Sequence, residues 1–316
     1  MTATLRCKTA LGLWPGVFSF LILGALAAAS GQDVRLGEED VIRWRIGVEV
    51  KATGALTGGV ATMVVPMDWP ERTVKIVDED VAKQALKPTF KDLPGARMMT
   101  VTFPKLNAGD EARVALTFEI AKREIDAPEE TDGLKTPDKP NRDTQPYLGL
   151  SPFIETNDPQ IKAKAKEAAA EGAEGWAKVE GLYDWVREHV AYKFDPQIRP
   201  AKDALAAGHG DCEELTSLFI AFCRNHNIPA RSVWVPGHCY PEFYLVDAYG
   251  NGHWYPCQAA GDKQFGRMHE ARPILLKGDS FKLPDQPKPL RYVQQTFRAK
   301  SAASDPMVKF ILEKAE

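Results

Sequence analysis

The sequence predicts an α+β protein in which an all-β sandwich precedes a domain of helices followed by antiparallel strands. Residues 34–125 have a two-residue hydrophobic period, residues 161–225 a helical one, and residues 231–257 again resemble strands. The length of 316 residues, with 44% hydrophobic and 26% charged residues, fits a globular chain of one large or two ordinary domains. A net charge of −3 creates no overall field for nucleic acid, so no nucleic-acid partner is expected.

Residues 1–31 have the composition of a secretory signal peptide. A short basic stretch precedes the apolar run from Leu11 to Leu26, and small residues follow it. We expect cleavage after Ala29 or Gly31, and an uncleaved membrane anchor is the alternative. No later stretch approaches the ~18 apolar residues of a membrane helix. The sequence therefore predicts an exported protein, periplasmic or extracellular, with no integral membrane segment after signal cleavage.

Residues 32–125 are expected to form the β-sandwich. Hydrophobic residues alternate with polar ones near both ends, at Ile42, Trp44, Ile46, Val48 and Val50 and at Val114, Leu116, Phe118 and Ile120. Shorter strand patterns lie between them at 60–66, 73–77 and 98–103. Because this stretch contains neither His nor Cys, we expect it to be a targeting or spacing module.

Residues 126–146 are polar, contain four Pro and lack periodicity, so they are expected to be a linker. The second domain is placed at 147–280. Its predicted helices cover 161–171, 176–190 and 212–225, and its predicted strands cover 231–235, 242–246 and 252–257. Residues 281–316 form a C-terminal tail that is Pro-rich, then weakly helical at 306–314, and we assign it no role.

Cys212 is the candidate nucleophile. It lies in the sequence Gly-His-Gly-Asp-Cys-Glu-Glu, in the first turn of the predicted helix 212–225, with Asp211 as N-cap. A helix N-terminus stabilises a thiolate, and its N–H groups can bind an oxyanion. Gly208 and Gly210 would let the backbone turn sharply and leave room for a substrate. The alternative is a small buried hydrophobic residue, which the flanking acids argue against.

His238 is the candidate base. A thiolate nucleophile needs an imidazole that accepts its proton and later protonates the leaving amine. His238 follows Pro236-Gly237 and opens a predicted strand, so its ring can project into a cleft at the end of a sheet. Taken alone, a single His is more often a structural residue.

Residues 181–258 resemble the transglutaminase-like core, which has a papain-like fold. The matching segments are Tyr183-Asp184-Trp185-Val186-Arg187, Val190-Ala191-Tyr192, Gly210-Asp211-Cys212-Glu213-Glu214, Leu218-Phe219, Arg224, Asn227-Ile228-Pro229-Ala230-Arg231 and His238-Cys239-Tyr240-Pro241-Glu242-Phe243-Tyr244. Asn227 replaces a Gly of the family pattern, and Tyr240 replaces a Trp. The resemblance is to exported bacterial members with an N-terminal β-domain. It implies that Cys212 is the nucleophile and His238 the base.

The third catalytic position departs from the family pattern. Four residues after its Trp the family has an Asp that orients the imidazole, but here Trp254 is followed by Gln258. An amide oxygen still fixes the imidazole tautomer, yet it stabilises an imidazolium less than a carboxylate does, so a lower rate would follow. Asp247, just before a predicted hairpin turn, and Asp262, in the following loop, are the alternatives. We favour Gln258.

The other cysteines and histidines have structural interpretations. Cleavage of the signal peptide leaves Cys212, Cys223, Cys239 and Cys257. Cys223 is expected in the core, or in a disulfide with Cys239 or Cys257. Zinc binding is the weaker alternative, because no Cys-x-x-Cys occurs, and no acidic loop of the EF-hand type indicates Ca²⁺. No metal and no cofactor are expected.

Four aromatic residues could line a peptide-binding cleft or fill the core: Trp234, Tyr240, Trp254 and Tyr255. We expect each of them in the core.

The sequence thus predicts an exported thiol-dependent hydrolase or acyltransferase of cysteine-protease type. Its substrate would be a protein or peptide amide, and its catalytic residues would be Cys212, His238 and Gln258. The alternative is a catalytically degenerate domain that binds polypeptide or cell-wall ligands, which Gln258 favours and the intact Cys–His pair opposes. The oligomeric state is not predicted.

Overall fold

The computed structural model describes residues 35–284 and 286–316. The signal peptide predicted at 1–31 lies outside these residues. Within the described range, no helix has the length and apolar character needed to span a bilayer.

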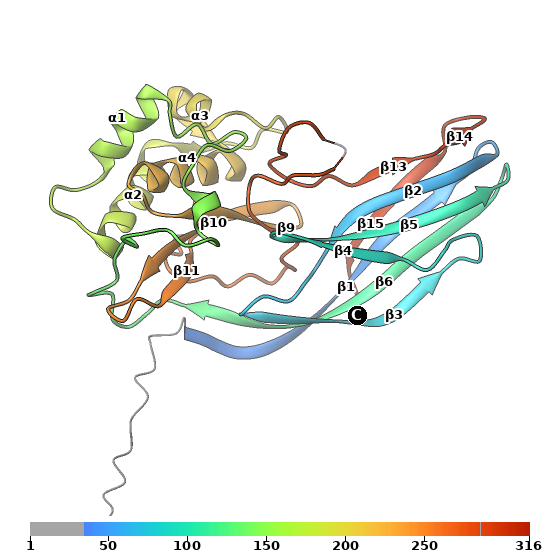
Figure 1. The fold of residues 1–316 in the computed structure, drawn as a ribbon, viewed down its shortest axis with the longest axis horizontal. Coiled ribbons are helices and arrows are strands. Elements are labelled where there is room, and N and C mark those ends of the chain that lie inside the picture. Colours follow the sequence, from blue (N-terminus) through green and yellow to red (C-terminus); the bar gives the residue numbers. More distant parts are fainter. Residues whose placement is uncertain (1–34, 285) are drawn as a thin grey trace, which may run out of the picture. The chain divides into compact units, whose positions relative to one another are not determined.

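The N-terminal half of the described chain is a β-sandwich (Figure 1). One sheet contains the long strands β1 (Arg35–Lys51) and β6 (Glu111–Asp126), flanked by β3 (Arg72–Val81) and by β15 (Met307–Lys314). The facing strands are β2 (Leu56–Val65), β4 (Thr89–Leu93) and β5 (Ala96–Leu106). The inward residues of β1 are buried as its alternation predicts, among them Ile46, Val48 and Val50.

The second sheet continues beyond the sandwich into the C-terminal half. Its order is β11-β10-β9-β12-β5-β2-β13, where β9 is Ala230–Val235, β10 His238–Val246 and β11 Gly252–Pro256. The connecting strand β12 (Leu276–Lys277) has only two residues. Leu276 pairs with Ala96 on one side and with Trp234 on the other. The strands of the predicted second domain therefore share a hydrogen-bonded sheet with those of the sandwich.

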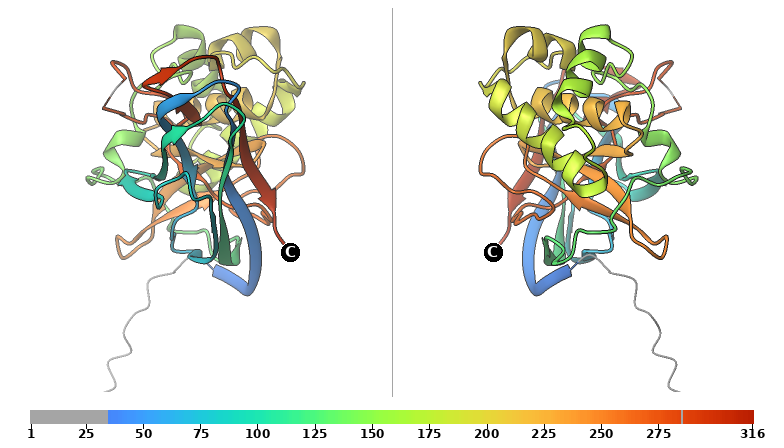
Figure 2. Two further views of the ribbon diagram at one scale, coloured as in Figure 1. Left: turned by 90° about the vertical axis from the view of Figure 1, so that its right-hand side faces the viewer. Right: turned by 90° about the vertical axis from the view of Figure 1, so that its left-hand side faces the viewer.

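The helices cover one face of β9–β11. They are α1 (Pro159–Ala168), α2 (Gly175–His189), α3 (Ala201–Ala207) and α4 (Cys212–Asn225), and α3 has no counterpart in the sequence prediction. Figure 2 shows the helices in front in one view and the sandwich strands in front in the opposite view. The apolar stripe of α4, which includes Leu218, Phe219 and Phe222, packs with Phe243 of β10 in a buried cluster. This antiparallel sheet with helices on one face is the predicted α+β fold.

Residues 281–316 are part of the sandwich. Strands β13 (Thr296–Arg298) and β14 (Ser301–Ala302) pair with β2, and β15 pairs with β1. The helix predicted at 306–314 is wrong. Val308, Phe310 and Leu312 alternate with period two and pack against the sandwich core, a pattern that a strand satisfies and a helix does not.

The segment predicted as a linker is fixed to the rest of the chain. Apart from the 3₁₀ turn η1 (Gln145–Tyr147) at its end, residues 126–146 form no helix or longer strand. Lys135 nevertheless exchanges two backbone hydrogen bonds of 2.9 Å with Val246, and Leu134 and Thr144 are buried. The described residues form one compact unit, so the segment is a packed connection.

Candidate active site

Cys212 is the first residue of α4, and the local sequence determines the start of that helix. The Asp211 carboxylate accepts hydrogen bonds from the N–H groups of Glu213 at 2.7 Å and of Glu214 at 3.4 Å. The Glu214 carboxylate in turn accepts from the Asp211 N–H at 2.8 Å, which completes a capping box. The N–H of Cys212 also belongs to the first turn of α4, whose N–H groups have no partner within the helix.

Gly208 and Gly210, which precede Cys212, are glycines for different structural reasons. Gly208 ends α3 in the left-handed region, with φ of 68°, and the space beside its Cα is open. A Cβ at Gly210 would lie 2.8 Å from the Cβ of Glu214 and 3.2 Å from that of Ala204. Gly210 therefore permits close packing under the capping box, and the room for a substrate expected at this residue is filled by protein.

His238 is the first residue of β10, and its ring is held between Gln258 and Cys212. Its Nε2 lies 2.8 Å from Oε1 of Gln258. Because an amide oxygen only accepts, Nε2 carries the proton, and in the neutral ring Nδ1 is free to accept one. The imidazole is also close enough to the Cys212 thiol for each group to shift the pKa of the other. The structure therefore brings together the three residues that the sequence predicts as nucleophile, base and orienting amide.

Gln258 is fixed through its backbone by α2. Its carbonyl oxygen accepts from the Tyr183 hydroxyl and from Nη1 of Arg187, both at 2.8 Å. Its N–H donates to the carbonyl of Gln264 at 2.8 Å. Tyr183 and Arg187 lie in the segment that resembles the family pattern, and the sequence alone assigns them no role.

The two alternative carboxylates lie elsewhere. Asp247 follows the far end of β10 from His238, and its carboxylate accepts from the N–H groups of Tyr249 and Asn251 in the turn. Asp262 is exposed in the loop after β11. Of the three candidates, Gln258 is the one that contacts His238.

Residues 162–259 match the Transglutaminase-like superfamily, over a range that contains Cys212, His238 and Gln258. These residues form a transglutaminase-like domain. Among curated proteins the chain has no match.

Among solved structures, the chain is similar to a candidate cysteine protease from Cytophaga hutchinsonii. The two are 15% identical with a TM-score of 0.55, and the match covers 88% of this chain and 93% of the other. At this identity the likeness establishes the fold alone. A weaker match, with a TM-score of 0.33 and 14% identity, is the periplasmic domain of TgpA from Pseudomonas aeruginosa bound to ethylmercury. It covers 72% of this chain and 90% of that one.

The thiol of the transglutaminase-like domain is strongly acidic. The pKa of Cys212 is lowered to about 5, first by a hydrogen bond from the Cys239 thiol and then, against the opposing effect of burial, by the hydrogen bond and charge of His238. Burial lowers the pKa of His238, but its bonds to Cys212 and Gln258 outweigh burial and raise it overall. Both shifts favour a thiolate–imidazolium pair at neutral pH.

Charged side chains surround the pair. Arg272 forms two hydrogen bonds with the Glu270 carboxylate, at 2.8 and 2.7 Å, and donates to the carbonyl of Pro236 at 3.1 Å. It thereby braces the turn that leads into His238. Burial raises the pKa of Glu213, the neighbour of Cys212, to about 7, although the cation of Arg291 opposes this effect. Glu270, Arg272 and Arg291 are remote from Cys212 in the sequence, and only the folded chain brings them to this site.

Two exposed aromatic residues belong to the segment that runs beside the approach to Cys212. Strand β7 (Ala191–Tyr192) pairs in parallel with β8 (His209–Gly210), which directly precedes Asp211 and Cys212. Tyr192 is 58% exposed and Phe194 in the following loop 71%. The sequence marks Tyr192 only as part of the approach to Cys212.

Of the four aromatic residues expected in the core, three lie there and Trp254 does not. Trp234, Tyr240 and Tyr255 are buried, whereas Trp254 is half-buried and its ring lies 4.0 Å from the guanidinium carbon of Arg231. All four cysteines of the described residues are free. Within those residues, no group of three or more His, Cys, Asp or Glu side chains is arranged to hold a metal ion.

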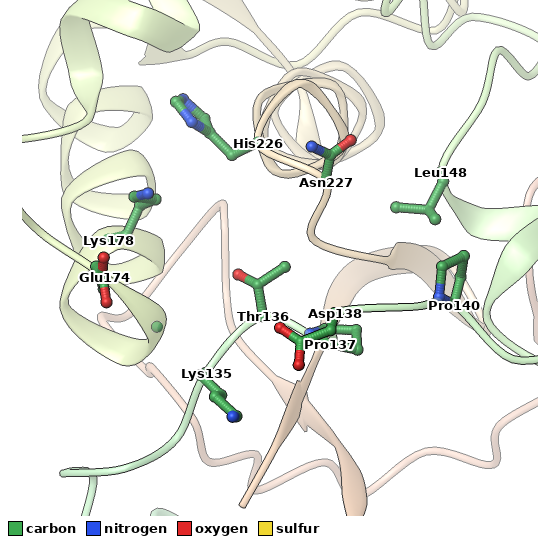
Figure 3. Close-up of a pocket in the computed structure, with 11 residues that line it drawn as sticks. Lys135, Thr136, Pro137, Asp138, Pro140, Leu148, Glu174, Lys178, His226 and Asn227 are labelled. Carbon is green, nitrogen blue, oxygen red and sulfur yellow. The ribbon is translucent and has the colours of Figure 1, made fainter. Parts of the chain in front are cut away.

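A cavity of about 540 Å³ lies at the opposite end of α4 from Cys212 (Figure 3). Its lining comes from residues 135–140, from the start of α2 at Glu174 and Lys178, and from His226 and Asn227 after α4. Since α4 has 14 residues, roughly 20 Å separates its two ends. This cavity is therefore separate from the Cys–His pair.

Proposed function

We propose that this chain is an exported cysteine hydrolase that cleaves an amide bond in a protein or peptide through a thioester on Cys212. The observation that carries the proposal is the hydrogen bond between His238 and Gln258, together with the His238 ring that lowers the pKa of Cys212 at the start of α4. The match of residues 162–259 to the Transglutaminase-like superfamily supports the chemistry, and the pattern of residues 1–31 supports export.

In the first step, the Cys212 thiolate attacks the carbonyl carbon of the amide. The N–H of Cys212, at the positive end of α4, is the proposed donor to the oxyanion that forms. As the C–N bond breaks, the His238 imidazolium gives its proton to the leaving nitrogen. The products of this step are a free amine and a thioester on Cys212.

In the second step, neutral His238 removes a proton from water, and the hydroxide attacks the thioester carbon. The acid product leaves and the thiolate is restored. The amide oxygen of Gln258 keeps the same imidazole nitrogen protonated through both steps. Water is the proposed acceptor because it needs no second binding site, and an amine acceptor would give cross-linking instead.

The proposed substrate is a polypeptide segment with apolar side chains. Tyr192 and Phe194 are exposed in the segment that runs beside the approach to Cys212, although side chains of this size are usually buried. A peptide that crosses the start of α4 would cover them. This part of the proposal predicts weaker hydrolysis of peptides with only polar residues near the cleaved bond.

The test is the pH dependence of iodoacetamide alkylation at Cys212 in the full chain. We expect half-maximal reactivity near pH 5, because the pKa of Cys212 is lowered to about 5. In His238→Ala the midpoint moves up towards the ~8.5 of an ordinary thiol, because the imidazolium no longer stabilises the thiolate. His189→Ala, which removes an exposed imidazole at the end of α2, is the matched control and leaves the profile unchanged.

Hydrolysis is then measured with a panel of peptide amides, with Cys212→Ala as the blank. A reactive thiolate together with peptide cleavage supports the proposal. An ordinary thiol profile that His238→Ala does not alter would contradict it and would favour the binding-module alternative.

A further inference from the structure

Two of the cysteines in the described residues meet at the candidate active site. Cys212 is partly exposed, whereas Cys239, one residue after His238, is 1% exposed. The Cys239 sulfur lies 3.6 Å from the carbonyl oxygen of Cys212, and the two thiols are close enough for each to shift the pKa of the other. The register of β9 and β10 pairs Cys239 with Trp234, and the contact with the Cys212 carbonyl places Cys239 at the start of α4.

The backbones on both sides of this contact are tied together. Thr216, one turn into α4, donates from its hydroxyl to the carbonyl of Cys239 at 3.4 Å. The first turns of α4 and the start of β10 are thus held next to each other. A disulfide needs an S–S distance of about 2.0 Å, so its formation requires the Cys212 side chain to turn towards Cys239.

We propose that Cys212 and Cys239 form a reversible disulfide that blocks the nucleophile under oxidising conditions. The other two cysteines provide a contrast inside the same protein. Cys223 and Cys257 lie in the core under the helices, where both are fully buried. Since neither thiol reaches solvent, an oxidant has no access to that pair.

The reaction begins at Cys212, the partly exposed thiol. Its thiolate attacks a small-molecule disulfide, RSSR, so that a mixed disulfide forms and one RS⁻ leaves, which takes up the proton lost by Cys212. The Cys239 sulfur then attacks the Cys212 sulfur, and the second RS⁻ leaves with the Cys239 proton as RSH. In sum, two thiols and one RSSR give one protein disulfide and two RSH.

The contact between the two thiols also favours the first step. The Cys239 thiol is the first cause of the lowered pKa of Cys212, so the residue that would resolve the mixed disulfide also keeps the attacking sulfur as a thiolate. The disulfide itself requires no enzymatic activity. Only its role as an off-switch rests on the proposed function.

The experiment incubates the purified full chain with oxidised glutathione at neutral pH and maps its disulfides by mass spectrometry. The expected product is a cross-linked peptide pair containing Cys212 and Cys239, about 2 Da lighter than the two free peptides. Iodoacetamide labelling of Cys212 is lost in parallel and returns after reduction with dithiothreitol. Mapping by peptide separates this pair from any disulfide that involves Cys7.

Two variants sharpen the test. Cys239→Ser is expected to stop at a stable glutathione adduct on Cys212, and Cys223→Ser, the matched buried control, is expected to behave like the unaltered protein. The map of the unaltered protein decides the matter even if Cys239→Ser fails to fold. A persistent glutathione adduct on Cys212 without the cross-link, or no reaction at Cys212, would overturn the inference.

Peptide hydrolysis by the reduced and oxidised forms separates this inference from the proposed function. A cross-link in a protein whose reduced form cleaves no peptide would leave the disulfide standing and count against the hydrolase. Cleavage that persists after the cross-link has formed would overturn the role of the disulfide as a switch.

Discussion

The two ends of α4 each hold an arginine against a carboxylate, and the two pairs are built in opposite ways. At the C-terminal end, Arg224 and Asp279 are both 0% exposed and lie 2.8 Å apart. At the N-terminal end, Arg291 and Glu213 are 3.5 Å apart, and Glu213 keeps 23% of its side chain exposed. We call the buried pair Arg224–Asp279 the closed pair and the partly exposed pair Arg291–Glu213 the loose pair.

The hydrogen bonds of the two arginines show the same difference. Arg224 also donates to the carbonyl oxygens of Gly149 and Ala230 and to the hydroxyl of Ser151. Arg291 donates to the carbonyl of Glu213, but its Nε and Nη1 have no hydrogen-bond partner among the described residues. A fully satisfied buried pair fixes the fold, whereas an incompletely satisfied one next to a nucleophile is typical of a site.

The largest expected effect comes from breaking the closed pair. Arg224→Met leaves Asp279 as a buried carboxylate without its cation, and we expect the free energy of unfolding to fall by about 3–5 kcal/mol. The double variant Arg224→Met, Asp279→Leu should lose less, because no charge remains buried. Urea unfolding measures both. A loss below about 1 kcal/mol in the single variant would contradict the structural role of the pair.

A smaller effect is expected at the cap of the N-terminal end. Asp211→Ala removes the acceptor for the N–H groups of Glu213 and Glu214, which should cost about 1–2 kcal/mol of stability. Iodoacetamide labelling of Cys212 should also slow, because a frayed first turn stabilises the thiolate less. Asp262→Ala, an exposed acid in a loop, is the control and should change neither quantity.

The smallest effect on stability is expected at the loose pair. Glu213 has a pKa raised to about 7, so its charge costs stability as pH rises from the pKa of an ordinary carboxyl through 7, and this cost is absent at lower pH. Glu213→Gln removes that cost and also one partner of Arg291, and we expect a net change below about 1 kcal/mol by urea unfolding at neutral pH.

The same variant should leave the midpoint of alkylation near pH 5. The pKa of Cys212 is lowered to about 5, so its thiolate is already formed at the pH near 7 where Glu213 becomes charged, and at pH 5 a neutral Glu213 and a Gln carry the same charge. If Glu213→Gln lowered the free energy of unfolding as much as Arg224→Met, both ion pairs would be structural, and the two ends of α4 would not differ in this respect.

The sequence predicts local structure well where one periodicity dominates. The helix from Cys212 to Asn225 has the predicted bounds and the predicted Asp211 cap, because an amphipathic stripe and a capping signal agree there. The sequence predicts a helix at 306–314, where the structure has the strand Met307–Lys314. The alternation of apolar and polar residues is short there, and its Lys and Glu residues also suit a helix. Its partner β1 is remote in the sequence, and no local pattern reveals that pairing.

The residues of the candidate site likewise differ in how clearly the sequence indicates them. Cys212 and His238 lie in continuous motifs, so their residue types and order indicate them. Gln258 is distinguished from Asp247 and Asp262 by its hydrogen bond to His238. That bond depends on the path of the chain after β11, which Tyr183 and Arg187 of α2 fix through the Gln258 carbonyl. The contact of Cys239 with Cys212 depends likewise on strand register. The sequence therefore indicates Cys239 only as a candidate disulfide partner of Cys223.

The pairing of β1 with β15 also bears on the order in which the molecule can be completed. Trp44 lies opposite Lys314, and Lys51 lies opposite Met307. A nascent chain that ends before residue 307 leaves this edge of β1 without hydrogen-bond partners, and such edges associate with other chains. Contacts so distant in sequence also slow folding. The sandwich sheet can therefore close only after its C-terminal strand has been synthesised.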